Sequence, residues 1–177
     1  MSEDAMRERI INEMKDVFGD DQPRIDHALK VLEYAETIVR SEPGSPGVVV
    51  AAAILHDIGI HEAERKHGSS AGRFQEIEGP PVARDILERL GLSADDVDHI
   101  CRIIGSHHSA GDIDTPEFRI IWDADWLVNL PDEYPEMDEA KRADKIRAIF
   151  RTPAGLALAL KRFGPEAGTI EGASNEQ

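Results

Sequence analysis

The sequence has few of the features that mark secreted or membrane proteins. Cys101 is its only cysteine, which excludes an internal disulfide framework. Residues 1–9 carry acidic and basic side chains where a secretory signal peptide would be basic and then apolar. No uninterrupted apolar run approaches the roughly 20 residues that a membrane-spanning helix needs. We therefore expect a cytoplasmic protein.

Basic side chains are also scarce. The 20 Lys and Arg residues face 35 Asp and Glu residues, for a formal net charge of −15. Such a charge repels phosphate backbones and anionic lipids over any extended contact. We expect neither duplex nucleic acid nor a membrane as a partner. A small anionic ligand remains compatible, because a bound metal with a few Lys or Arg side chains makes a pocket locally positive.

Strand patterns are nearly missing, whereas apolar residues recur at spacings of three and four. At 177 residues and 41% hydrophobic content, the chain suits one compact all-α domain with a substantial core. The expected helices are about 3–18, 23–42, 46–58, 80–90, 94–108, 116–130, 136–150 and 153–163. Residues 164–177 are polar, and we expect a frayed tail there.

Residues 60–79 are expected to form a long connection. The segment is polar and rich in Gly and Ser, and Pro80-Pro81 after it is typical of a first helical turn. Connections of this length in compact domains often carry function.

His56-Asp57 ends the apolar run 48–55. A carboxylate in such surroundings loses several kcal/mol of hydration unless a cation or hydrogen bonds replace the water. The plainer interpretation is a hydrogen-bonded pair that caps its own helix. We favour a bound divalent metal ion, because other residues of the right type face the core.

Those other residues lie on separate predicted helices. His27 is four residues before Val31, and Asp125 is four residues after Ile121, so both fall on inward stripes. Two imidazoles and two carboxylates make a reasonable ligand set for Fe, Mn, Co, Ni or Zn. Spacing alone shows only that each residue points to the core side of its helix.

A histidine on an early helix, an adjacent His-Asp pair and a later aspartate within 123–127 resemble the HD superfamily of metal-dependent phosphohydrolases. The resemblance spans about residues 24–130 and implies a compact multi-helix bundle with a metal site in its core. Helices at about 135–163 would follow. The implied ligands are His27, His56, Asp57 and Asp125. Asp123 competes for the last place, but the family tends to use the aspartate of an Asp-x-Leu sequence, as in Asp125-Trp126-Leu127.

Some branches of this family bind two ions, with the aspartate of the His-Asp pair as a bridge and two further histidines on the second ion. His107 matches the later of those positions, with His108 beside it, and we expect at least one of the two to bind metal rather than only to interact with the dipole at its helix C-terminus. Where the earlier histidine would stand, this chain has Glu78. Glu78 either takes that place or leaves a single ion, and it would otherwise interact with the N-terminal dipole of the next helix.

The resemblance implies hydrolysis of a phosphate ester of a small phosphorylated metabolite or nucleotide. The cofactor would be one or two divalent ions of Fe, Mn, Co, Ni, Zn or Mg. Asp57, His61 and Lys66 are the catalytic candidates, since the segment after the His-Asp pair should rise beside the metal. The candidates for substrate contacts are Lys66, His67, Arg73 and His108.

Two other functions remain open from the sequence. A minority of two-iron relatives are oxygenases that cleave carbon bonds with dioxygen, and a third possibility is a metal-binding or nucleotide-binding regulatory module without turnover. The sequence also leaves the oligomeric state open, a homo-oligomer included.

Overall fold

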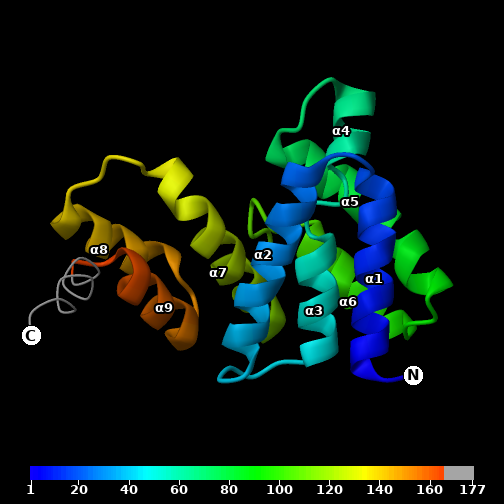
Figure 1. The fold of residues 1–177 in the computed structure, drawn as a ribbon, viewed down its shortest axis with the longest axis horizontal. Coiled ribbons are helices and arrows are strands. Elements are labelled where there is room, and N and C mark those ends of the chain that lie inside the picture. Colours follow the sequence, from blue (N-terminus) through cyan, green and yellow to red (C-terminus); the bar gives the residue numbers. More distant parts are fainter. Residues whose placement is uncertain (166–177) are drawn as a thin grey trace, which may run out of the picture.

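The computed structural model describes residues 1–165, and these form nine α-helices and no strand (Figure 1). The all-α prediction is therefore confirmed for this part of the chain, while the tail expected at 164–177 lies almost wholly outside it. None of these helices is long and apolar enough to cross a membrane. The helices are α1 (Glu3–Phe18), α2 (Gln22–Val39), α3 (Pro46–Leu55), α4 (Ile60–His67), α5 (Gly72–Arg89), α6 (Ala94–Ile104), α7 (Pro116–Glu133), α8 (Glu139–Ile149) and α9 (Pro153–Phe163).

Helix α3 is the centre of the core. It packs against α2, α6, α1 and α7, and Figure 1 shows it between α2 and α1. Its apolar side chains point in every direction, so the helix is suited to burial on all sides. Ala51, Ala52 and Ala53 are fully buried and let the neighbouring helices approach closely.

The helix starts follow the capping residues in the sequence. Ser2, Ser93 and Thr115 each accept a hydrogen bond through the side chain from the backbone N–H three residues later. Each thereby satisfies one of the free N–H groups of a first turn. Thr115 and Pro116 begin α7, the long helix that carries Asp125.

The expected long connection over 60–79 is wrong. Residues 60–67 form α4, and after a short link α5 begins at Gly72. Helix α4 was missed because its polar residues face solvent and only Ile60 and Ala63 are buried. Gly68 ends α4 in the left-handed conformation (φ 66°), which explains why glycine stands there.

Four prolines begin helices as the sequence predicted, but three others do not begin or end a helix where it was expected. Pro80 and Pro81 lie inside α5, and Pro131 lies inside α7, which continues to Glu133. Each proline lacks the N–H that would donate to the carbonyl four residues earlier. Packing of α5 on α4 and α6 outweighs that loss.

The helix ends near the candidate site are also earlier than expected. Helix α3 stops at Leu55 and α6 stops at Ile104, so His56-Asp57 and His107-His108 both lie in the turns that follow. Turns at helix ends can aim two consecutive side chains at one point, which a continuous helix cannot do.

Candidate metal centre

The turn after α3 holds His56 and Asp57 in fixed positions. The His56 side chain is fully buried, and its Nδ1 lies 2.8 Å from the carbonyl oxygen of Ala53. The turn is closed by the Ile60 N–H, which donates to the Asp57 carbonyl at 3.1 Å. A side chain at Gly59 would place its Cβ 2.4 Å from the backbone nitrogen of Gly79 in α5, so this turn lies directly against the α5 backbone.

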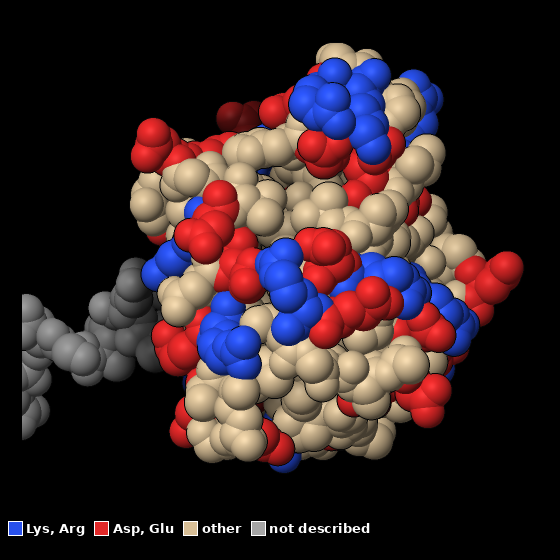
Figure 2. Space-filling view, turned by 90° about the vertical axis from the view of Figure 1, so that its right-hand side faces the viewer, with Lys and Arg blue, Asp and Glu red and all other residues tan. Residues whose placement is uncertain are grey.

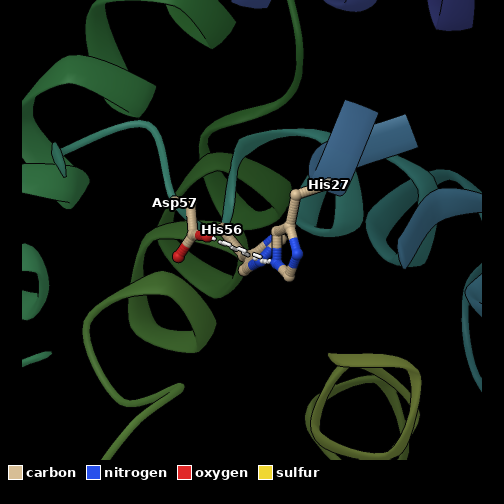
Figure 3. A group of neighbouring side chains, drawn as sticks. All are labelled: His27, His56 and Asp57. Atoms are coloured by element: carbon tan, nitrogen blue, oxygen red, sulfur yellow. Dashed lines mark hydrogen bonds and ion pairs between the residues drawn. The ribbon is translucent and has the colours of Figure 1, made fainter. Parts of the chain in front are cut away.

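His27 from α2 and Asp125 from α7 meet this turn. The Nε2 atom of His27 lies 3.2 Å from His56 Nε2, 3.4 Å from Asp57 Oδ2 and 3.1 Å from Asp125 Oδ1. His56 Nε2 in turn lies 3.3 Å from Asp57 Oδ2 and 3.5 Å from Asp125 Oδ1. Figure 3 shows the side chains of His27, His56 and Asp57 converging from α2 and from the turn. The four residues therefore form one cluster, which we call the first cluster.

The hydrogen positions in the first cluster follow from its contacts. The Ala53 carbonyl can only accept, so His56 Nδ1 carries the hydrogen and Nε2 of the neutral ring has a lone pair. That lone pair faces the carboxylates of Asp57 and Asp125, which also only accept. Acceptors this close and this deeply buried require a cation or a proton between them.

The pKa values in the first cluster also indicate that a positive charge belongs between these acceptor atoms. Burial alone would lower the pKa of His56, but the Asp57 and Asp125 carboxylates raise it well above its ordinary value. Burial would raise the pKa of Asp57, but His56 and His107 hold it well below its usual range. Imidazole nitrogens and carboxylate oxygens suit a divalent transition metal, so the residues fit such an ion.

His107 repeats the pattern on the other oxygen of Asp57. Its Nδ1 lies 2.7 Å from the carbonyl oxygen of Ile104, and its Nε2 lies 3.2 Å from Asp57 Oδ1. His108 is next to it, with the two ring centroids 4.0 Å apart. Asp57, His107 and His108 each offer a ligand atom, and these atoms lie within 4.8 Å of one another. We call these three residues the second cluster.

Asp123 and Asp125 are placed very differently. Asp123 is fully buried, and its carboxylate accepts from the Arg151 N–H, the Thr152 N–H and the Thr152 hydroxyl at 2.7–2.8 Å. These donors tie α7 to the start of α9. Asp125 instead joins the histidines, and Asn129 donates to its Oδ1 at 2.8 Å. The structure therefore brings Asp125, and not Asp123, beside His27 and His56.

Glu78 and the basic candidates form pairs outside the first cluster. The Glu78 carboxylate binds Lys66 Nζ at 2.7 Å and His67 Nε2 at 2.9 Å, and these two partners lower its pKa. His61 Nε2 pairs with Asp21 Oδ2 at 2.8 Å, and the Arg73 guanidinium lies over the Phe74 ring. Within residues 1–165, none of these five residues shares a hydrogen bond or ion pair with the first cluster.

Several residues near the clusters escaped the sequence analysis. Asn129 has a recognisable signal, because it lies four residues after Asp125 on the same helical face. Gln75 and Glu76 bind the turn that carries His108, but they lie in the segment expected to be a connection, where no helical face was assigned.

Comparisons with known proteins agree with this architecture. A family model described as HD domain matches residues 24–130. A solved crystal structure of a predicted HD superfamily hydrolase from an uncultured Thermotogales bacterium is 24% identical in sequence, with a TM-score of 0.66. The likeness covers 92% of this chain and 86% of that one. The search of curated proteins found no match.

Proposed function

Because the chain belongs to the HD domain family, we propose that it is a metal-dependent phosphohydrolase whose first ion is held by His27, His56, Asp57 and Asp125. The observation that carries this proposal is the first cluster itself, in which buried acceptor atoms from three separate parts of the chain face one another. The substrate would be a phosphate ester of a small phosphorylated metabolite or nucleotide. Helices α8 and α9 lie outside the matched region but α9 packs on α7, which supports one domain.

A divalent ion at this site would lower the pKa of a bound water for attack on phosphorus and would offset the charge that develops on the phosphate oxygens. The chain's own residues supply the geometry. The Ala53 carbonyl orients the His56 ring, and Asn129 orients the Asp125 carboxylate. His56 is fully buried, whereas the His27 side chain is 20% exposed, so the substrate would enter from the side of His27.

Basic side chains near α4 would contribute to substrate binding. Figure 2 shows Lys and Arg side chains gathered at the end of the molecule where α4 lies, on an otherwise mixed surface. We propose substrate phosphate contacts for Lys66, His67, Arg73 and His108, and proton transfer by His61 or Lys66 beside Asp57. Lys66 and His67 would have to exchange Glu78 for the substrate phosphate, since both bind Glu78 in the free protein.

The test is a panel of phosphate esters assayed with Mn²⁺, Co²⁺, Ni²⁺, Mg²⁺ or Fe²⁺. We expect metal-dependent release of phosphate, and Asp57→Ala should lower the rate by more than about 100-fold, beyond the 10–100-fold typical of changes outside the ligand shell. Asp16→Ala, at an exposed position of α1, is the matched control. A folded, metal-loaded protein without turnover on the panel would contradict the proposal.

A second candidate function is a two-iron oxygenase. The observation that favours it is that the two oxygens of Asp57 face different imidazoles, His56 through Oδ2 and His107 through Oδ1. Purified protein with close to two irons per chain and a mixed-valence electron-spin signal would support the oxygenase. A single colourless ion would exclude it.

A further inference from the structure

The side-chain amide of Gln75 is buried, and both its nitrogen and its oxygen form hydrogen bonds. Only 8% of the residue is exposed. Its Nε2 donates to the Ser70 carbonyl oxygen at 2.7 Å, and its Oε1 lies 3.1 Å from His108 Nε2. Because the Ser70 carbonyl can only accept, the amide nitrogen must face it, and the amide oxygen must then face His108.

Helix α5 also fixes the position of the His108 ring and of its backbone. A Cβ added at Gly72 would lie 2.7 Å from His108 Cγ and 2.9 Å from Cδ2. The Cγ–Cδ2 edge of the His108 ring therefore packs directly on the α5 backbone. Glu76 Oε1 accepts from the backbone N–H groups of His108 and Ser109 at 3.0 and 2.7 Å. The ring therefore has little freedom to turn.

These contacts decide which nitrogen of His108 has a lone pair. An amide oxygen accepts but does not donate, so the neutral His108 ring carries its hydrogen on Nε2 while the Gln75 bond stands. The lone pair is then on Nδ1. A metal ion binds an imidazole through the nitrogen that has the lone pair.

Glu78, the other candidate for the third place in the second cluster, already has partners. One of its carboxylate oxygens accepts from Lys66 and the other from His67. His108, in contrast, already has a ring nitrogen within 4.8 Å of ligand atoms of Asp57 and His107.

We propose that Gln75 is a positioning residue, which holds His108 with its hydrogen on Nε2 so that Nδ1 completes a second ion site with Asp57 and His107. His108 then binds this ion in place of a contact with the substrate phosphate. This inference rests on the proposed function only in assuming that the first cluster binds an ion. It assigns no role in turnover to Gln75.

The first test is the tautomer of His108. Long-range ¹H–¹⁵N spectra of the metal-free protein distinguish a nitrogen that carries hydrogen from one with a lone pair. We expect hydrogen on Nε2 in the wild type and in Gln75→Glu, whose protonated carboxyl group would donate to the Ser70 carbonyl and still accept from that nitrogen. We expect a mixture of both forms in Gln75→Leu. A wild-type ring with hydrogen on Nδ1 would overturn the proposal.

The second test is Co²⁺ binding by the full chain, followed by calorimetry and by the visible spectrum. We expect two ions in the wild type, with the weaker one about 10–100-fold weaker still in Gln75→Leu and largely restored in Gln75→Glu. Gln22→Leu is the matched control, because Gln22 binds only Asp26 on α2. Thermal unfolding and circular dichroism check that each variant is folded.

The outcomes separate this inference from the proposed function. A wild type that binds one Co²⁺, or a folded Gln75→Leu with unchanged binding of the second ion, would overturn the role of Gln75 and leave a one-ion phosphohydrolase untouched. Two ions with the expected tautomer but no turnover on the phosphate-ester panel would contradict the phosphohydrolase and support the role of Gln75.

Discussion

Asp123 and Asp125 lie two residues apart on α7, both in the interior, yet they have opposite surroundings. Asp123 faces the start of α9 and receives hydrogen bonds from three donors. Asp125 receives a hydrogen bond from the Asn129 side chain at 2.8 Å. Its Oδ1 also faces the Nε2 nitrogens of His27 and His56 at 3.1 and 3.5 Å. A buried carboxylate thus indicates a metal site where nitrogen lone pairs face it, and not where hydrogen-bond donors satisfy both of its oxygens.

Glu78 resembles Asp123 in that both of its carboxylate oxygens have hydrogen-bond donors. Its oxygens are satisfied by Lys66 and His67, as those of Asp123 are by backbone and hydroxyl donors. Satisfied carboxylates of this kind join elements of the fold, here α4 to α5. Asp57 is the opposite case, because each of its oxygens faces a histidine nitrogen whose ring hydrogen is bound elsewhere.

We expect Asp123→Asn and Asp125→Asn to differ most in how strongly a bound metal ion stabilises the folded protein. An ion that binds only the folded protein raises the free energy of unfolding by about 4 kcal/mol at 1,000 times its dissociation constant. We expect Mn²⁺ or Zn²⁺ to do so for the wild type and for Asp123→Asn, but not for Asp125→Asn. Denaturant unfolding with and without the ion measures this. Equal stabilisation of the two variants by the ion would contradict the assignment of Asp125, and not Asp123, as a metal ligand.

A middle-sized effect is expected on stability without metal. In Asp123→Asn the amide NH₂ faces a backbone or hydroxyl donor of 151–152, which leaves a buried polar group without a partner and costs about 1–3 kcal/mol. In Asp125→Asn the amide oxygen can still accept from Asn129 and the amide NH₂ faces acceptor atoms of the first cluster, so this variant should cost less. The check is chemical denaturation of chelator-treated protein. A greater loss for Asp125→Asn would contradict this assignment.

The smallest effect is expected for Glu78→Gln. Lys66 and then His67 lower the pKa of Glu78 below its ordinary value of 4.5. The carboxylate therefore contributes stability at pH values above that range, and the contribution is lost as the pH falls through its folded pKa. Wild type and variant should differ slightly at pH 7 and converge in acid, as followed by thermal unfolding. The metal content should not change, and its loss would identify Glu78 as a ligand instead.

The sequence predicted the first cluster because helical spacing places His27, His56 and Asp125 on inward faces. It could not show that they meet, since His27 and Asp125 are 98 residues apart and their contact depends on how α2 packs on α7. Helix α4 was missed because two buried residues in eight are a weak periodic signal. That error also hid Gln75, whose role depends on α5 beginning before the two prolines.

The contact between Gly59 and Gly79 has a mechanical consequence. Two backbones touch there with no side chain between them, since an added Cβ would lie within 2.4–2.9 Å of the atoms of residues 78 and 79. Flexible side chains usually absorb small displacements between helices, and this junction has none. A displacement of α5 at Gly79 is therefore passed directly to the turn that holds Asp57, the carboxylate shared by both clusters.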